Sequence, residues 1–455
     1  MREDIDQYIS EIRDIINRRD EELAHAELEQ MHPADIAELY QALDLEEAEY
    51  LYNLLDEDTR ADVLMELDEE DRRKLLSNMP AKEIATQVID HLESDEAVDL
   101  IQELDEDERD EILSHINDVE QAGDIIDLLK YDEDTAGGLM GTEMIVVNEN
   151  WSMPECIKQM RMQAEDMDEI YYVYVVDNDD RLKGILPLKT LITRPSVSKI
   201  KHIMENDPVS VKTDTPIDDV ALDFEKYDLV AMPVVDSIGR LVGRITVDDV
   251  MDQVRESSER DYQLASGLSS DVDASDSILA QTKARIPWLL IGIVSGILAS
   301  LILSGFEEQI HAVTALALFI PIIGGTGGNV GVQASAIVVQ GLANGTLDIT
   351  EFAKQLWKEV RVGLLNATII AGAILVYNLI MLPEDLAVTL SVAVSLFIVV
   401  MFATLLGTIV PLTLEKLNIN PALATGPFIQ ISNDIVGLVI YVLISTCFLD
   451  IFSHG

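Results

Sequence analysis

One carboxylate stands inside the last long apolar stretch of the sequence. Asp434 is the only charged residue within any of the five apolar stretches that follow Arg285, if their ends are excluded. A carboxylate in hydrocarbon is costly, so it usually faces a water-filled path or a bound ion. A hydrogen bond to a neighbouring helix is the structural alternative. Helical spacing gives Asp434 a small and polar face, formed by Gly426, Gln430, Gly437 and Tyr441, with Asn433 beside it.

A glycine-rich run is the second segment of unusual chemistry. Residues 321–335 read PIIGGTGGNVGVQAS, with five glycines among polar side chains. Small residues let neighbouring helices approach closely, and carbonyls freed at membrane depth need protein or water around them. A close-packed helix crossing is one interpretation. We favour a pore-lining segment, in which Gly325, Gly328 and Asn329 line the path together with Gln430 and Asn433 of the last stretch.

The scarcity of carboxylates favours magnesium as the ion. Ca²⁺ takes about six to eight oxygen ligands, whereas Mg²⁺ keeps much of its water and binds through one or two carboxylates. No Cys, His or Met cluster accompanies Asp434, which disfavours soft transition metals, although Co²⁺ and Mn²⁺ stay alternatives. Two chains around a shared axis would supply two copies of Asp434. We therefore expect a homodimer with the ion path at its interface.

The five apolar stretches are each long enough to cross a bilayer. They cover residues 286–303, 312–342, 362–382, 386–414 and 421–452, and a crossing helix needs about 20 residues. Lys and Arg precede the first stretch and lie in the connections between the second and third and between the fourth and fifth stretches. The charged residues of the other two connections are all acidic: Glu307, Glu308, Glu384 and Asp385. The positive-inside rule then predicts a multi-pass protein of the cytoplasmic (inner) membrane, in contact with lipid, with the N-terminus cytoplasmic and the C-terminus outside. The N-terminal MREDIDQYIS lacks the apolar core of a signal peptide.

The first 285 residues carry most of the net charge of −52. They hold 73 acidic and 27 basic residues, which excludes nucleic acid as a partner. The acidity indicates either a solvated surface or a surface that collects cations. Units of 12 or 13 residues, which begin with a leucine or methionine and a capping residue, recur between residues 43 and 116 and predict a solenoid of short helices. The two cysteines support neither a disulfide framework nor a thiolate metal site.

A second duplication has a spacing of 59 residues. VVDNDDRLKGILPL at 175–188 is echoed by VVDSIGRLVGRITV at 234–247. Each copy predicts a buried strand, a tight turn, a second strand and a helix. We expect a pseudo-symmetric α/β pair, followed by a helix from Val247 and a polar stretch that leads to the membrane.

These segments together resemble the MgtE family of magnesium transporters over nearly the whole chain. The specific motifs are TAGGLM at 135–140, GGTGGNVGVQ at 324–333, and PALATGP at 421–427 with Asn433 and Asp434. The resemblance implies a multidomain membrane protein with an acidic helical N domain (1–130) and a tandem CBS pair (131–255). A connecting plug helix (256–280) and a pore domain of five transmembrane helices (281–455) complete it.

The resemblance also implies a function. Mg²⁺ would be both substrate and regulator: a homodimer would conduct it down its gradient with Asp434 holding a hydrated ion, and cytosolic Mg²⁺ would close the gate by bridging the N domain, CBS pair and plug helix. The implied regulatory ligands are Asp95, Asp99, Asp218, Asp228, Asp249, Asp252 and Asp261. Similar CBS pairs often bind adenine nucleotides, so ATP is a further expectation, although the cytoplasmic half has no phosphate-cradling glycine loop.

Two other classes of function compete with transport. A membrane-anchored sensor would keep the CBS pair and leave Asp434 a structural role. An enzyme would need a cluster of nucleophile, base and orienting residue, or a metal-binding histidine motif, and the seven histidines form none. We therefore expect a protein that is not an enzyme.

Overall fold

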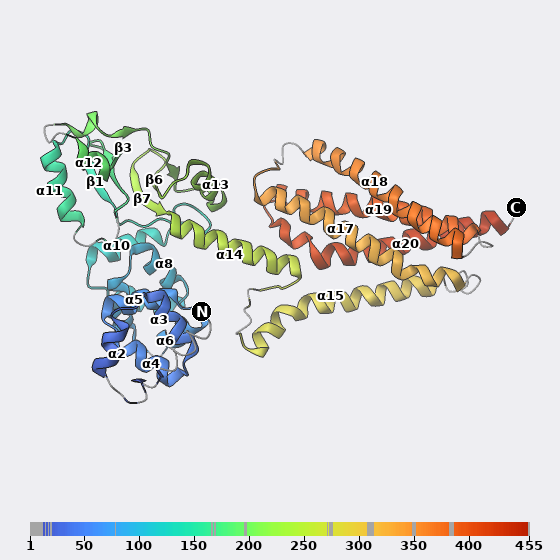
Figure 1. The fold of residues 1–455 in the computed structure, drawn as a ribbon, viewed down its shortest axis with the longest axis horizontal. Helices are drawn as coiled ribbons and strands as arrows, with labels where there is room; N and C mark the ends of the chain where they lie inside the picture. The colour runs from blue at the N-terminus through green and yellow to red at the C-terminus, as the bar shows by residue number, and fades with distance from the viewer. Residues whose placement is uncertain are drawn as a thin grey trace. The chain divides into compact units, whose positions relative to one another are not determined.

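Two units make up the fold, Met1–Gln253 and Val254–Gly455 (Figure 1). The computed structural model describes residues 12–13, 15–16, 18, 21–77, 79–164, 167, 170–194, 198–270, 272, 276–306, 314–347, 352–381 and 386–453. The acidic connections at 307–308 and 384–385 and the N-terminal decapeptide lie outside these ranges. The orientation in the membrane therefore stays a prediction, as do the domain boundaries at 130, 255 and 280.

Short helices form the first part of the N-terminal unit. Aspartates begin several of them: Asp44 and Asp56 each accept a hydrogen bond at 3.0 Å from the amide three residues on, and Asp68 does so at 2.9 Å. These caps satisfy amides that the helix itself leaves without partners. The short helices of this unit are α2 (Glu21–Leu28), α3 (Pro33–Ala42), α4 (Leu45–Leu54), α5 (Glu57–Glu66), α6 (Glu69–Leu76), α7 (Ala81–Gln87), η1 (Ile89–His91), α8 (Ser94–Gln102), α9 (Glu106–Leu113) and α10 (Val119–Leu128). The predicted run of short helices between residues 43 and 116 is confirmed, but α7, α8 and α9 begin without a side-chain cap, and the expected cap Ser94 is the first residue inside its helix.

The duplicated sequence folds into two small sheets. The first has the order β1 (Ile145–Asn148), β2 (Tyr172–Val176), β3 (Leu182–Pro187) and β4 (Glu205–Asn206), with α11 (Met153–Gln163), α12 (Leu188–Thr193) and η3 (Ile200–His202). The second has the order β5 (Val211–Lys212), β6 (Ala231–Val235) and β7 (Leu241–Thr246), with α13 (Ile217–Tyr227) and α14 (Val247–Ser266). In both sheets a parallel pair is followed by an antiparallel pair.

The two copies also share their irregularities. The antiparallel register shifts between Val175 and Val176 in one copy and between Val234 and Val235 in the other. Asp177 accepts hydrogen bonds from the amides two and four residues on, and Asp236 repeats this turn. The predicted duplication is therefore confirmed at the level of single hydrogen bonds.

The cores of the two copies differ in extent. Residues of β6, β7 and α13, including Met232, Ile245 and Phe224, share one buried cluster with the short N-terminal helices. The first copy buries a separate core around Val173 and Leu186. The second copy is therefore the one that packs against the acidic helices.

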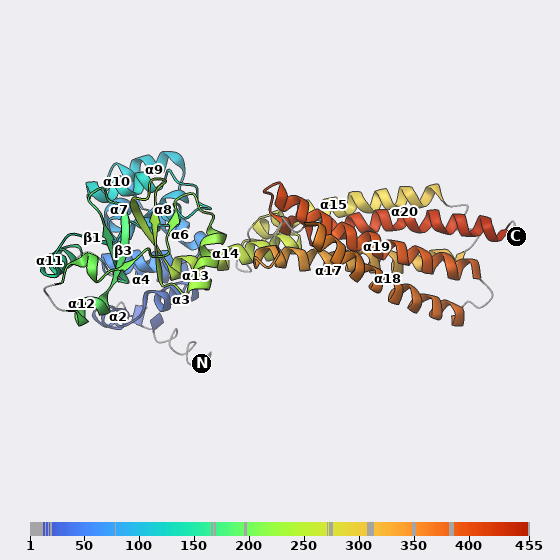
Figure 2. The ribbon, with the colours of Figure 1, turned by 90° about the horizontal axis from the view of Figure 1, so that it is seen from above.

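Five long helices dominate the second unit. They are α15 (Ile278–Gly305), α17 (Ile320–Ala343), α18 (Phe352–Met381), α19 (Leu386–Lys416) and α20 (Gly426–Ser453), with the short helices η4 (Thr314–Phe319) and η6 (Pro421–Ala424). All five are long and apolar enough to span a membrane, as predicted. They run alongside one another in both views (Figures 1 and 2). α19 is the most enclosed of the five, whereas the apolar window of α15 has no residue buried within the chain.

Candidate functional site

Asp434 on α20 faces the glycines of α17. A Cβ atom at Gly324 would lie 3.2 Å from Oδ1 of Asp434, and one at Gly328 would lie 3.2 Å from Cγ of Gln430 and 3.9 Å from the same Oδ1. Within the described residues Asp434 makes no hydrogen bond or ion pair, and it keeps part of its surface exposed. The glycines therefore leave room beside a carboxylate that no cation of the described residues neutralises.

Asn433 points to a different neighbour. Its side chain is fully buried against Gly331, so close that a Cβ atom there would overlap its Nδ2. Neither Nδ2 nor Oδ1 finds a partner in the described part of the chain. The sequence grouped Asn433 with the lining residues, but the structure places it inside the helix packing of a single chain.

α17 also presents polar residues on its outer side. Gly325, Asn329 and Gln333 recur every four residues and are all exposed. Such a stripe on an apolar helix is poorly suited to lipid. Gln430 on α20 is exposed as well. The predicted lining residues therefore lie in different places. Gly325, Asn329 and Gln430 are exposed, Asn433 is buried, and Gly328 is buried beside Gln430.

The predicted regulatory carboxylates Asp95, Asp99 and Asp249 gather in the N-terminal unit. Asp95 lies in the first turn of α8, and burial, reinforced by the charges of Asp249 and Glu143, raises its pKa well above the usual value. Asp99 keeps an exposed surface, but surrounding protein atoms desolvate its carboxylate and, with the charge of Asp249, raise its pKa to about 6. Raised pKa values indicate carboxylates that lack compensating cations.

Asp249 is held at the start of α14. Its carboxylate accepts hydrogen bonds from the amide of Thr246 at 3.1 Å and from the Thr246 hydroxyl. Burial nevertheless raises its pKa, with the charge of Asp248 adding to the effect. Burial and the charge of Glu93 likewise raise the pKa of neighbouring Glu96 to about 7.

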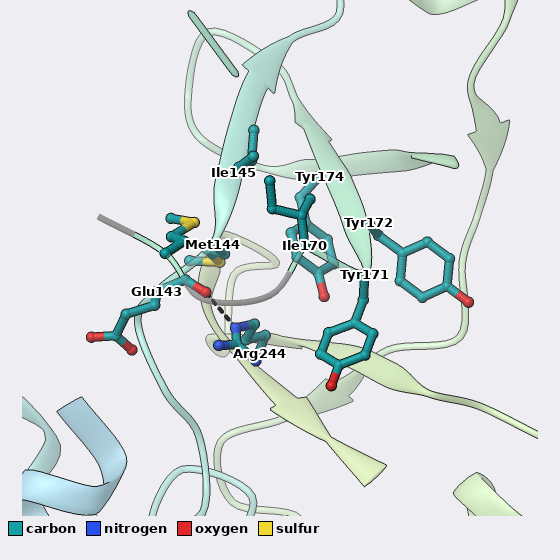
Figure 3. Close-up of a pocket in the computed structure, with 9 residues that line it drawn as sticks. Glu143, Met144, Ile145, Ile170, Tyr171, Tyr172, Tyr174 and Arg244 are labelled. Atoms are coloured by element: carbon teal, nitrogen blue, oxygen red, sulfur yellow. Dashed lines mark hydrogen bonds between the residues drawn. The ribbon is translucent and has the colours of Figure 1, made fainter. Parts of the chain in front are cut away.

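Arg244 is the cation of this acidic cluster. It is 6% exposed, and its Nη2 lies 2.8 Å from a carboxylate oxygen of Glu93. Its backbone exchanges two 2.9 Å hydrogen bonds with Gly141, and its Nε donates to the carbonyl of Glu143. Figure 3 shows Arg244 beside Glu143, at a small pocket that Tyr171, Tyr172 and Tyr174 also line.

Two further carboxylates in this cluster escaped the sequence analysis. Glu93 and Glu143 can each place an oxygen within 4.8 Å of one another and of Asp95. Glu143 also accepts hydrogen bonds from the Ser94 amide at 3.0 Å and hydroxyl at 2.9 Å. The internal repeat holds a signal that could have indicated the site, because Arg244 stands where the first copy has Ile185.

The remaining predicted regulatory residues lie elsewhere. Asp218 is in the first turn of α13, and Asp228 follows that helix with a left-handed φ of 51°. Asp252 is exposed on α14. Asp261, further along α14 and in the second unit, accepts a 2.8 Å hydrogen bond from Nδ2 of Asn420. None of these four is among the charges that dominate the pKa values of Asp95 and Asp249.

Comparisons with known proteins match the helical N-terminal part, the two small sheets and most of the five-helix part. Residues 320–444 match the MgtE divalent cation transporter family, 31–134 match the MgtE intracellular N domain, and 136–196 and 200–256 match CBS domains. Over 325 residues, 70% of this chain and 71% of the relative, the chain is 38% identical to the magnesium transporter MgtE of Thermus thermophilus. The chain belongs to the MgtE family. The MgtE magnesium transporter of Bacillus subtilis is 30% identical over 70% of each chain.

Two solved structures agree with the fold over about half of this chain. The soluble part of a magnesium transporter superposes with a TM-score of 0.51 at 28% identity and covers 56% of this chain and 99% of the relative. The cytosolic domain of the Mg²⁺ channel MgtE in complex with ATP gives 0.51 at 33% identity, covering 54% and 99%. The predicted fold class is confirmed: a helical N domain, a tandem CBS pair and an apolar five-helix domain. Membership of a divalent cation transporter family also confirms that the chain is not an enzyme.

Proposed function

We propose that the chain forms a homodimeric Mg²⁺-selective channel that takes up magnesium across the cytoplasmic (inner) membrane. The observation that carries this proposal is Asp434, a partly exposed carboxylate opposite the glycines of α17 and without a cation among the described residues. A hydrated divalent ion supplies both the charge and the hydrogen-bond donors that this carboxylate lacks. The relatives named as magnesium transporters support the choice of ion.

The exposed stripe of α17 supports a second copy as partner. Gly325 and Asn329 are polar or small and lie on the outside of one chain, where lipid would leave an amide without partners. A second copy at this face would cover the stripe and bring two Asp434 carboxylates to one path. Lipid would then contact the apolar outer helices, with the N-terminus cytoplasmic and the C-terminus outside.

Cytosolic Mg²⁺ closes this channel, in our proposal, by binding to the acidic cluster. Asp95, Asp99 and Asp249 repel one another when ionised, as their raised pKa values indicate. A divalent ion between them favours the packed arrangement, because it binds that arrangement more tightly than an open one. Asp218, Asp228 and Asp252 remain proposed ligands of further regulatory ions, whereas for Asp261, which accepts a hydrogen bond from Asn420, we propose a structural contact instead.

ATP at the CBS pair is a further part of the proposal. Its support is the relative whose cytosolic domain was solved in complex with ATP, at 33% identity. The two copies are chemically unequal for such a ligand, because Thr246 and Asp249 of the second correspond to Pro187 and Thr190 of the first. Equilibrium dialysis of radiolabelled ATP with the full-length protein would test this part separately. Failure to bind at millimolar ATP would remove it.

One preparation tests permeation and feedback together. The full-length protein is reconstituted in planar bilayers, and the current carried by Mg²⁺ is recorded while Mg²⁺ on the cytoplasmic side is raised. We expect a Mg²⁺ current that falls as cytoplasmic Mg²⁺ rises. Absence of current would contradict the channel, and a current indifferent to cytoplasmic Mg²⁺ would contradict the feedback. Substituting Co²⁺ or Mn²⁺ as charge carrier measures selectivity.

A further inference from the structure

The C-terminal end of α14 contacts the segment that precedes α20. Nδ2 of Asn420 donates to Oδ1 of Asp261 at 2.8 Å, while Oδ1 of Asn420 accepts from the amide of Ala422 at 2.8 Å. The Asn420 side chain therefore caps η6 with its oxygen and binds α14 with its nitrogen. A carboxylate at 420 could perform the first task but not the second, because it has no N–H to donate.

The backbones meet at the same place. A Cβ atom at Gly426 would overlap the carbonyl oxygen of Ala265, so only glycine fits there. Gly267 has a φ of +84°, and a Cβ atom on it would lie 2.5 Å from Cγ of Pro427. The end of α14 and the start of α20 thus touch backbone to backbone at Gly426, and at Gly267 the backbone packs on the Pro427 ring, which leaves little freedom for one to move without the other.

The end of α14 has a defined geometry of its own. The amide of Leu268 donates to the carbonyl of Gln263 at 3.0 Å, and that of Gly267 donates to Leu264 at 3.1 Å, which is the Schellman pattern of a helix ended by glycine. Both the amide and the hydroxyl of Ser269 then donate to the carbonyl of Ala284 in α15 at 3.0 Å. The chain after α14 is therefore tied to α15 as well.

α14 carries a proposed regulatory ligand at one end and this contact at the other. Asp249 lies in its first turn, and Asp261 lies one turn before its end. α20 starts at Gly426 and carries Asp434 on its third turn. A displacement of the end of α14 would consequently be passed to the helix that holds the proposed ion-binding carboxylate.

We propose that the Asn420–Asp261 hydrogen bond and the Gly426–Ala265 contact form a metal-independent joint through which α14 positions α20. Asn420 is then a positioning residue of the gate. An amide bonded to a carboxylate needs no divalent ion, whereas two facing carboxylates would need one to avoid repulsion. The inference rests on the proposed feedback by cytosolic Mg²⁺ and adds the contact that delivers it to α20.

The test compares Mg²⁺ currents of full-length variants as cytoplasmic Mg²⁺ is raised. Asn420→Leu removes the hydrogen bond to Asp261 together with the cap on η6, whereas Asn420→Asp keeps the cap and replaces the hydrogen bond with repulsion. The double variant Asn420→Asp with Asp261→Asn restores an amide–carboxylate pair in the reverse direction and keeps the cap on η6. Asn418→Asp is the matched control, since it adds the same charge to the same loop two residues away. Size-exclusion chromatography and current at the lowest cytoplasmic Mg²⁺ confirm that each variant folds.

The joint predicts how the cytoplasmic Mg²⁺ concentration that closes the channel should differ among the variants. We expect the cytoplasmic Mg²⁺ for half closure to rise about fivefold in Asn420→Leu, the equivalent of one solvent-exposed hydrogen bond of about 1 kcal/mol. Asn420→Asp should need about tenfold more Mg²⁺, yet still close fully, because a divalent ion can then bridge the two carboxylates. The double variant and Asn418→Asp should close like the wild type.

Two results would overturn the joint, and they differ from failure of the proposed function. If the wild type closes with Mg²⁺ and Asn420→Leu closes at the same concentration, α14 does not act through Asn420. If the double variant behaves like Asn420→Asp, the pair is not the relevant contact. If the wild type itself shows no closure, the feedback proposal fails first and the joint fails with it.

Discussion

Carboxylates are used in opposite ways in the two units. In the membrane unit Asp434 stands alone beside glycine backbone, with no neighbouring cation among the described residues. In the N-terminal unit Asp95, Asp249 and several glutamates crowd together, and the buried Arg244, with Arg72 near Asp99, offsets part of their charge. In the proposed homodimer, an ion at Asp434 would meet two carboxylates, one from each chain, and could leave again. An ion entering the cluster relieves repulsion among many charges.

The difference suggests what each site selects for. A lone carboxylate with room beside it suits an ion that keeps its water, which favours passage over retention. A crowded cluster converts ion binding into a change of packing, because the packed form binds the ion more tightly. The same cation can therefore be conducted by one unit and sensed by the other, and each half of this contrast can be tested separately.

Replacing the lone carboxylate should have the largest effect. Asp434→Ala should lower Mg²⁺ uptake into proteoliposomes by about 100-fold, since no other charged side chain is available on that face. Asp450→Asn, near the end of the same helix, is the control and should transport normally. Wild-type uptake by Asp434→Ala would show that the carboxylate is structural and would remove the contrast between the units.

Replacing Arg244, the buried cation of the acidic cluster, should have the second largest effect. Arg244→Met removes the buried ion pair with Glu93 and should destabilise the N-terminal unit by about 3 kcal/mol, the lower end for a broken buried pair. Arg240→Met, which breaks an exposed pair with Asp236, should cost less than about 1 kcal/mol. Denaturant unfolding of both variants in EDTA measures the difference. Equal costs would show that the cluster does not depend on Arg244.

The glycines of α17 should differ according to what faces them. Gly331→Ala should destabilise the membrane unit by about 1–3 kcal/mol, because the added methyl overlaps Asn433. Gly325→Ala meets no atom of its own chain, so in the detergent-separated monomer it should be neutral or stabilising by up to about 1 kcal/mol through helix propensity. Thermal unfolding in detergent compares them. A harmless Gly331→Ala would mean that the α17–α20 contact is looser than the structure shows.

Acid should partly substitute for Mg²⁺ at the cluster, with the smallest effect of the four. Glu96 and Asp99 have folded pKa values of about 7 and about 6, above their ordinary 4.5 and 3.8, so the folded form binds more protons. Stability in EDTA should then fall as pH rises from about 4 to about 7 and level off above that.

Thermal unfolding of the full-length protein in EDTA measures this pH dependence. We expect a melting temperature a few degrees higher at about pH 5.5 than at about pH 8, and addition of Mg²⁺ at pH 8 should remove the difference. A melting temperature that rises with pH in EDTA would contradict crowding of the carboxylates. It would also weaken the distinction between the two units.

Local sequence patterns were sufficient for much of the fold. The spacing of capping aspartates predicted the short helices, and the repeat at 59 residues predicted two strand–turn–strand copies, because caps and tight turns depend on neighbours within a few residues. The five apolar stretches predicted the long helices for the same kind of reason. Asp434 could be singled out because a charge in a long apolar run is conspicuous without any knowledge of contacts.

The sequence alone could not show which of these residues meet. Asn433 and Asp434 are adjacent, yet one is buried against Gly331 and the other faces Gly324, because a step along a helix turns the side chain by about 100°. Glu93, Glu143 and Arg244 come from segments far apart in the chain. The sequence by itself determined the helices and strands and singled out one carboxylate in an apolar helix. The tertiary structure decided which side chains contact one another, because contacts between distant segments depend on how whole helices and sheets pack rather than on local pattern.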